Sequence, residues 1–301
     1  MAVLELEHVR KAYDGHVAVD DLSLAIEDGQ IFGLLGPNGA GKTTAIRMMI
    51  GIIMPDAGAV RMFGEPFARR HLRSVGYLPE ERGLYRRIKV IDHLVFLGEL
   101  NGMSRSAALA AAWQWAERLE IDEWLGHKVE ELSKGMQQKV QFIATILHDP
   151  RFIIMDEPFA GLGPRNSALL MEILLELRRN GRTILFSTHR MDQVERACDA
   201  ICLIDRGRCM LHGELGAIKA RFGKRNVQIA YEGGAGFLDH NPLVDARCDY
   251  GNYVEVRLAA GADAQELLRA ATACARITRF ELMEPSLEQI FLEVVGANDR
   301  R

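Results

Sequence analysis

Long apolar runs are missing from this sequence of 301 residues. No stretch approaches the roughly 18 consecutive apolar residues that a membrane-spanning helix needs. The opening segment places Glu5, Glu7, Arg10 and Lys11 where a secretory signal peptide would need apolar residues. We therefore expect a chain that stays in the cytosol.

Cysteine is scarce, and its spacing does not favour cross-links. The chain has five cysteines, an odd number, and none belongs to a Cys-x-x-Cys pair. This pattern indicates neither a disulfide framework nor a zinc site. We expect the cysteines to be small apolar residues of the interior. They are Cys198, Cys202, Cys209, Cys248 and Cys274.

An excess of charge of either sign is also missing. The chain carries 37 Lys and Arg against 41 Asp and Glu, a formal net charge of −4. This balance does not favour nucleic acid as a partner. Disorder is excluded because 48% of the residues are hydrophobic and only 26% are charged. The length corresponds to about two domains of roughly 150 residues each.

The first fifty residues predict strands, a glycine-rich loop and a helix. Residues 3–7 and 22–26 alternate between apolar and polar side chains, which is typical of strands. Residues 30–35 are a short apolar run that ends in glycines, and helical spacing of apolar residues follows at 46–53. A buried strand therefore feeds a loop that opens a helix.

Helical periodicity dominates about residues 84–147, which we interpret as a helical insertion. Strand patterns return at 152–155 and 183–186 and alternate with helical ones at 167–179 and 191–197. Alternation of strands and helices predicts a mostly parallel α/β sheet.

The C-terminal part has a pattern of its own. A tract rich in glycine and charge at 219–236 leads to strand patterns at 227–231 and 253–258. Helix starts are predicted near Asp263 and Ser286. We expect a first domain at residues 1–219 and a small α+β domain at residues 220–301.

Residues 36–43 satisfy the phosphate-loop pattern G-x-x-x-x-G-K-[ST] between the predicted strand and helix. Its glycines let backbone N–H groups surround phosphate oxygens, Lys42 supplies a positive charge, and Thr43 offers a hydroxyl to Mg²⁺. An ordinary glycine turn is the alternative. The predicted nucleotide-binding residues are Gly36, Pro37, Asn38, Gly39, Ala40, Gly41, Lys42, Thr43 and Thr44.

Two adjacent acids, Asp156 and Glu157, end the predicted strand at 152–155. Adjacent carboxylates at the tip of a buried strand need either solvent or a cation. Beside a phosphate loop, Asp156 suits the shell of a Mg²⁺ ion, and Glu157 can polarise an attacking water. A solvated loop start is the alternative interpretation.

A third element, Leu132-Ser133-Lys134-Gly135-Met136-Gln137, precedes that strand. Read alone, Ser133 is a helix N-cap. A phosphate loop, this LSGGQ-like segment, an acidic strand end and the tripeptide at 187–189 follow in order, and together they resemble the ATP-binding cassette (ABC) ATPases over about residues 1–214. The resemblance implies an α/β phosphate-loop NTPase core with an antiparallel β subdomain and a helical insertion.

The resemblance also implies ATP and Mg²⁺ as cofactors and a second ABC ATPase subunit, identical or related, paired head to tail. Ser133 and the N–H of Gly135 would then contact the γ-phosphate bound by the other copy. Tyr13 falls where the family stacks an aromatic ring on adenine, although a tyrosine packed in the sheet is the alternative. His189 matches the switch histidine, which joins Glu157 and Lys42 in the implied catalytic set.

The sequence departs from the family pattern at Glu80, where a glutamine that contacts Mg²⁺ is usual. A carboxylate keeps the oxygen ligand and adds negative charge. The expected metal set is therefore Thr43, Glu80 and Asp156. We expect Glu80→Gln to retain ATPase activity with an altered Mg²⁺ dependence.

Other departures lie in segments that face the second copy in this family. Gly163 stands at the usual aspartate of the D-loop, which puts communication across the dimer in doubt. Lys134 and Met136 replace the first glycine and the glutamine of the signature, whereas Ser133 and Gly135 are kept. With Glu157 present, we expect hydrolysis.

A second resemblance concerns the kind of ABC system that the ATPase would serve. The segments at 77–85 and 284–291 are similar to ATPase subunits of type-two ABC exporters, including sodium- and drug-extrusion systems. This implies an integral membrane permease subunit, whose short helix would dock around residues 80–97, with residues 82–89 as a lip. A solvated charged turn is the alternative for the basic residues of that lip. The chain would then be peripheral on the inner face of the cell membrane. A soluble non-transport ABC ATPase or a regulatory nucleotide switch is the alternative.

Overall fold

A computed structural model describes residues 1–81, 83–222, 226–259 and 261–298. The chain divides into two compact units, Met1–Gly213 and Glu214–Arg301. The boundary predicted at residues 219 and 220 falls inside helix α7 (Leu215–Phe222) of the second unit. No helix among the described residues is long and apolar enough to cross a membrane.

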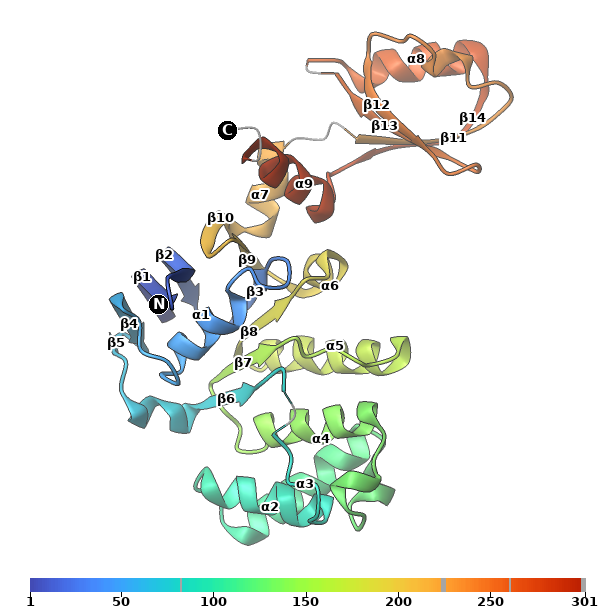
Figure 1. The fold of residues 1–301 in the computed structure, drawn as a ribbon. Coiled ribbons are helices and arrows are strands. Elements are labelled where there is room, and N and C mark those ends of the chain that lie inside the picture. Colours follow the sequence, from blue (N-terminus) through green and yellow to red (C-terminus); the bar gives the residue numbers. More distant parts are fainter. Residues whose placement is uncertain (82, 223–225, 260, 299–301) are drawn as a thin grey trace. The chain divides into compact units, whose positions relative to one another are not determined.

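The central sheet of the first unit has the strand order β10-β9-β3-β8-β7-β6 (Figure 1). Strands β3, β6, β7, β8 and β9 pair in parallel. Both faces of such a sheet are covered, which is why β3 and β7 are buried throughout and are nearly continuous apolar runs. The strands are β3 (Ile31–Leu35), β6 (Val75–Leu78), β7 (Phe152–Asp156), β8 (Thr183–Thr188), β9 (Ala200–Asp205) and β10 (Arg208–Glu214).

A second, antiparallel sheet has the order β2-β1-β4-β5. Asp14 and Gly15, with φ of 44° and 85°, form a two-residue turn that pairs Tyr13 with His16. Both turn residues have positive φ, as the tight hairpin turns that match strand twist require. The strands are β1 (Ala2–Tyr13), β2 (His16–Glu27), β4 (Ala57–Met62) and β5 (Glu65–Pro66).

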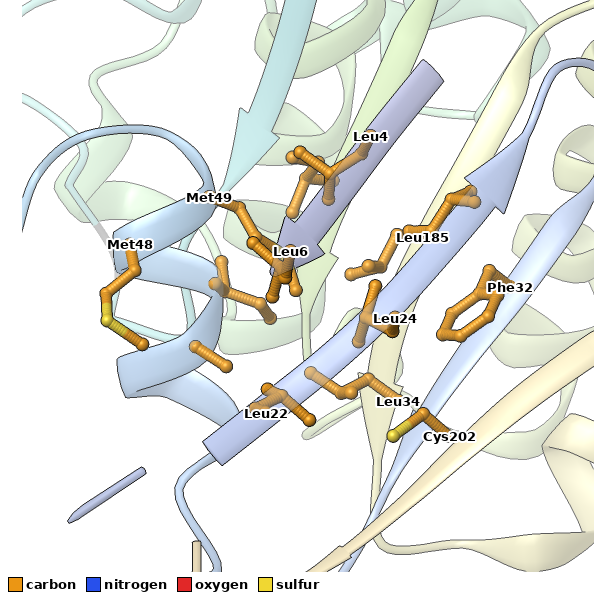
Figure 2. Packing of buried hydrophobic residues seen from close by; sticks show 14 of the residues in the cluster. Leu4, Leu6, Leu22, Leu24, Phe32, Leu34, Met48, Met49, Leu185 and Cys202 are labelled. Carbon is orange, nitrogen blue, oxygen red and sulfur yellow. The ribbon is translucent and has the colours of Figure 1, made fainter. Parts of the chain in front are cut away.

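Helix α1 (Lys42–Met49) lies beside the antiparallel sheet, and α5 (Pro164–Arg179) and α6 (Met191–Ala197) contact strands of the central sheet (Figure 1). Leucines of β1 and β2 and methionines of α1 pack with residues of β3 in one apolar cluster (Figure 2). Each fully buried side chain of this kind contributes about 1.5–3 kcal/mol to folding. The core therefore anchors the strand and the helix that flank the phosphate loop.

The region expected as a helical insertion holds α2 (Val90–Leu100), α3 (Arg105–Arg118) and α4 (Lys134–Ile146). Helix α4 also packs on β6 of the central sheet. Short 3-10 helices connect the larger elements, namely η1 (Arg69–Ser74), η2 (Asp122–Trp124) and η3 (Val129–Glu131).

The second unit is an antiparallel sheet of order β12-β13-β11-β14 with helices. Alternate residues of β11 and β13 are buried with apolar residues of α8 and η4 in a core of their own. Asp263 caps α8, as its position predicts, by accepting the N–H of Gln265. The elements are β11 (Asn226–Glu232), η4 (Gly236–Leu238), β12 (Val244–Asp249), β13 (Val254–Leu258), α8 (Ala264–Cys274), β14 (Arg276–Met283) and α9 (Leu287–Asn298).

The expectation for the cysteines needs correction. Cys198 and Cys202 are buried, but Cys209 is only partly buried, and Cys248 and Cys274 are exposed. Cys248 lies in an edge strand and Cys274 ends a helix, positions where one side of the element faces solvent.

Candidate functional site

The phosphate-loop motif begins directly after β3, and its last two residues, Lys42 and Thr43, open α1, as its pattern predicts. Gly41 has φ of 105°, and a Cβ there would lie 2.3 Å from the carbonyl oxygen of Ala18. A Cβ on Gly36 would lie 2.2 Å from the carbonyl oxygen of Ile204. Only glycine fits these contacts, so the loop is pressed against β2 and β9.

Lys42 points its amine back into the loop. Its Nζ donates to the carbonyl oxygens of Gly36 at 2.8 Å and Pro37 at 3.1 Å. Nζ also lies 3.8 Å from Oε1 of Glu157. Burial lowers the pKa of this amine, while the nearby carboxylates of Glu157, Asp156 and Glu80 oppose that shift. The hydrogen bonds from Lys42 thus hold its amine against the backbone of the phosphate loop.

Asp156 is buried at the carboxyl end of β7, with 1% of its surface exposed. Its Oδ1 accepts a hydrogen bond from the hydroxyl of Ser187, at the end of the neighbouring strand β8. Its Oδ2 is buried and has no hydrogen-bond partner among the described residues. A buried carboxylate oxygen without a partner is costly, and a divalent cation or its water shell would satisfy it.

Glu157 adopts φ of 50°, an uncommon value for a residue with a side chain. Its N–H donates to the hydroxyl of Ser187 at 3.0 Å. Its Oε1 lies 3.0 Å from Nδ1 of His189, and His189 is half exposed while Glu157 is nearly buried. The turn after β7 therefore aims one carboxylate toward both Lys42 and His189.

Lys42, Asp156 and Glu157 line a pocket of ≈ 340 Å³, whereas the predicted site residues Gly36, Pro37 and His189 are not among its described lining residues. It brings together most of the predicted set and adds His16 and Ala18. Tyr13 and His16 stand at its edge because the turn between β1 and β2 pairs them. The lining residues are Tyr13, His16, Ala18, Asn38, Gly39, Ala40, Gly41, Lys42, Thr43, Thr44, Glu80, Asp156 and Glu157.

Ser133 and Gly135 are not among the described residues that line this pocket. They begin α4, where the hydroxyl of Ser133 accepts the N–H of Met136, so the N-cap interpretation of Ser133 holds. A Cβ on Gly135 would make only van der Waals contacts, with side-chain atoms of Asn166 and Leu162 at 3.9 Å. These two residues present a free helix start rather than a part of the pocket of the same chain.

Helix α4 holds the two segments that approach the pocket. The side-chain amide of Gln138 donates to the carbonyl oxygen of Pro158 at 3.1 Å, just after Glu157. The amide of Gln141 donates to the carbonyl oxygens of Pro79 at 3.0 Å and Glu81 at 3.3 Å, on either side of Glu80.

A second hollow of ≈ 390 Å³ lies on the first unit, with more apolar than polar lining. It includes Leu84 and Leu97, within the region at 80–97 expected to receive a partner helix, and Tyr77 just before that region. Arg82, part of the expected lip at 82–89, lies outside the described residues. The other lining residues are Ile50, Ile52, Leu72, Val75, Pro79, Gly83, His93, Asn101, Gln141, Ala144, Thr145 and His148.

Four residues of the site were not predicted as such. His16 and Ala18 line the pocket, Ser187 bridges the two acids, and Gly207 donates its N–H to the carbonyl oxygen of Ala40 at 2.9 Å. The Asp-Gly turn could have indicated His16, because a two-residue turn pairs the residues on either side of it. Ser187 belongs to the tripeptide at 187–189, but no local signal points to its hydrogen bonds or to Gly207, since these contacts join distant parts of the chain.

Comparison with known proteins agrees with this geometry. Residues 19–160 match the family model described as ABC transporter, and residues 213–295 match the C-terminal domain of DrrA1-3-like ATP-binding proteins. The ABC transporter ATP-binding protein YhaQ of Bacillus subtilis is 43% identical over 295 residues, which cover 98% of this chain and 99% of that protein. A Nod factor export ATP-binding protein I of Cupriavidus metallidurans is 38% identical over 216 residues, or 71% of each chain.

Among solved structures, one described as the ATP binding subunit of an ABC transporter superposes with a TM-score of 0.68 at 31% identity. That match covers 73% of this chain and 93% of the other. The fold, the loop between β3 and α1 and the full-length likeness to YhaQ lead to one assignment: this chain belongs to the ATP-hydrolysing, ATP-binding subunits of ABC transporters.

Proposed function

We propose that this chain hydrolyses Mg²⁺-bound ATP in the pocket of the phosphate loop to power an exporter. The observation that carries the proposal is the convergence of Lys42, Asp156 and Glu157 on one pocket beside that loop. Backbone N–H groups of the loop and the start of α1 favour phosphate oxygens. Lys42 would leave the carbonyl groups of Gly36 and Pro37 and neutralise the phosphates.

Mg²⁺ fits the donor set beside the loop. Among the described residues no three acidic, His or Cys side chains form a metal-binding cluster, so the proposed site relies also on a hydroxyl and on phosphate oxygens. The hydroxyl of Thr43, the free Oδ2 of Asp156 and the carboxylate of Glu80 would hold the ion together with phosphate oxygens. When bound, Mg²⁺ supplies charge neutralisation at the phosphates.

Glu157 is the proposed general base. Its carboxylate, nearly buried and contacted by His189, would accept a proton from the attacking water. His189 contacts Glu157 and is half exposed, and we propose that it would also contact the γ-phosphate. Tyr13, which is 42% exposed at the pocket edge, would stack on the adenine ring.

The open start of α4 supports a paired assembly. Ser133 and Gly135 would contact the ATP held by a second ABC ATPase subunit, because they lie outside the pocket of their own chain. Gly163 begins α5 without a side-chain cap, at the position where an aspartate would face that partner. Residues 1–219 are proposed as the ATPase domain and 220–301 as an accessory domain.

The apolar hollow of the first unit supports docking of a membrane permease. Large apolar side chains stay exposed near it, with Tyr85 at 57%, Phe96 at 46% and Leu100 at 71%. A short permease helix seated there would place this subunit on the inner face of the cell membrane. Export is the favoured direction because relatives are named for Nod factor export.

The test uses Glu157→Gln in the full chain, with and without millimolar ATP. We expect this variant to form stable dimers with ATP and to lose about 10²–10⁴-fold in turnover, the range for loss of a general base. Ser133→Arg in the same background should prevent the dimer but leave monomeric ATP binding intact. A variant that stays monomeric at saturating ATP, or turns over ATP at the parental rate, would overturn the proposal.

A further inference from the structure

Cys202 and Cys209 lie on the neighbouring strands β9 and β10, with their sulfur atoms in contact. The Sγ atoms are 3.4 Å apart, and the thiol of Cys202 donates to the sulfur of Cys209. A disulfide needs an S–S distance of about 2.05 Å, so a small approach of the two side chains is enough to form it. The hairpin between them is short, which keeps the two thiols together.

The two thiols differ in accessibility and in chemistry. Cys202 is fully buried and pairs with Leu34 of β3 in the packed core (Figure 2). Cys209 is partly buried at the edge of that core. The hydrogen bond from Cys202 lowers the pKa of Cys209, and this bond together with burial raises the pKa of Cys202. Because the thiolate is the reactive form, Cys209 is the nucleophile of the pair.

The hairpin that carries these cysteines supports the phosphate loop from behind. Its turn residue Gly207 donates its N–H to the carbonyl oxygen of Ala40 at 2.9 Å. The carbonyl oxygen of Gly207 accepts the N–H of Asp20 at 2.8 Å. The carbonyl of Ile204, in β9, occupies the space where a Cβ on Gly36 would lie. A change in the spacing of β9 and β10 therefore reaches the loop through two backbone contacts, at Ala40 and Gly36, and reaches the neighbouring strand β2 through Asp20.

We propose that Cys202 and Cys209 are a peroxide-oxidised thiol pair whose disulfide weakens nucleotide binding at the phosphate loop. The Cys209 thiolate attacks a peroxide oxygen and the O–O bond breaks, which gives a sulfenic acid and, after protonation, one water. The Cys202 thiol then attacks the sulfenic sulfur and the S–S bond forms. The sulfenic hydroxyl takes up the proton of the Cys202 thiol and leaves as a second water. The two thiols lose two electrons and two protons in total, and the peroxide is reduced to two waters.

Formation of the disulfide would draw β9 and β10 together and displace the turn at Gly207, whose N–H donates to the carbonyl oxygen of Ala40. Loss or lengthening of one hydrogen bond behind the loop should weaken ATP binding by about two- to ten-fold. A dithiol reductant reverses the linkage and restores the affinity. The linkage itself does not depend on the proposed hydrolysis, which serves only as a readout of its effect.

The experiment treats the full chain with hydrogen peroxide and maps the linkage by mass spectrometry. Trypsin cleaves after Arg206 and Arg208, so the disulfide appears as two peptides that separate only after reduction. A Cys198→Ala, Cys248→Ser, Cys274→Ser chain removes every other thiol and makes the assignment unambiguous. The native chain is treated in parallel, so a folding defect of the triple variant does not decide the result.

ATP affinity is measured by fluorescence titration before oxidation, after it and after reduction. We expect the linked peptides together with a reversible loss of affinity, and neither in Cys209→Ser. If peroxide oxidises Cys209 without linking it to Cys202, the proposed disulfide between these two residues is wrong. Complete linkage with unchanged ATP affinity would overturn its effect on the loop, whereas failure of ATP to bind the reduced chain would instead contradict the proposed function.

Discussion

The hydroxyl of Ser187 joins the backbone of Glu157 to the side chain of Asp156. It accepts the N–H of Glu157 at 3.0 Å and donates to Oδ1 of Asp156. Ser187 is fully buried, so no water can replace it in either bond without rearrangement. One side chain thereby fixes the uncommon backbone of the proposed base and leaves one oxygen of Asp156 free for a cation.

Replacing Ser187 should therefore impair catalysis more than stability. We expect Ser187→Ala to lower kcat for ATP hydrolysis by about tenfold or more, since a hydrogen bond to a charged group is worth about 1.5–3 kcal/mol. Steady-state rates over a range of Mg²⁺ concentrations measure the effect. Ser187→Thr keeps the hydroxyl and should recover much of the rate; an equal defect in both variants would point to packing instead.

Gly41 and Gly39 offer a matched pair in the phosphate loop. Both have positive φ, but a Cβ on Gly41 would lie 2.3 Å from a carbonyl oxygen, whereas no atom lies within 4 Å of a Cβ on Gly39. Gly39→Ala should cost only the backbone strain of about 1–3 kcal/mol. Gly41→Ala should in addition displace the loop and abolish ATP binding. Thermal unfolding and ATP titration of both variants test this, and equal ATP affinities would contradict it.

Glu80→Gln tests the carboxylate that replaces the usual glutamine. The amide keeps an oxygen at the pocket but removes one negative charge near Lys42 and Asp156. We expect hydrolysis to continue, with the Mg²⁺ concentration for half-maximal rate raised by about two- to ten-fold. The rate is measured against Mg²⁺ at saturating ATP. Complete loss of turnover in a folded Glu80→Gln chain would show that the carboxylate has another role.

His93 makes stability depend on pH. It is 1% exposed, and neither ring nitrogen has a hydrogen-bond partner among the described residues. Burial lowers its pKa in the folded chain. In the unfolded chain histidine titrates near pH 6.5, so the unfolded state takes up the proton first as the pH falls. Stability should hold above about pH 7 and decline below it, by at most about 1.4 kcal/mol per pH unit for one proton.

Urea unfolding between pH 8 and pH 5 measures this decline. His93→Phe removes the titrating group from the same apolar site and should flatten part of the curve. Burial also lowers the pKa of His148 and His212, so His212→Phe provides a comparison away from the hollow. Identical slopes for the parent and His93→Phe would contradict the assignment to His93.

The sequence predicted the features that depend on local patterns. The phosphate loop, the acidic end of β7 and the cap of α8 are contiguous signals, and each lies on the predicted kind of element. The family assignment and the α/β core were likewise confirmed. The roles of the individual site residues stay predictions.

Contacts between distant segments could not be predicted in this way. Seven strands were not predicted, and their pairing partners depend on the assembled sheets; they are β4, β5, β6, β9, β10, β12 and β14. The contact of Gly207 with Ala40 joins residues that lie far apart in the chain. The Cys202–Cys209 contact was missed for a related reason, because their spacing resembles no cross-linking motif and only the hairpin brings them together.

The two glutamines of α4 hold backbone carbonyl groups rather than side chains. Gln138 and Gln141 donate to the carbonyl oxygens of residues 158, 79 and 81. These hydrogen bonds do not depend on which side chain stands at positions 79, 81 and 158. Substitutions at these positions can therefore alter the surface of both segments and still leave their attachments to α4 in place.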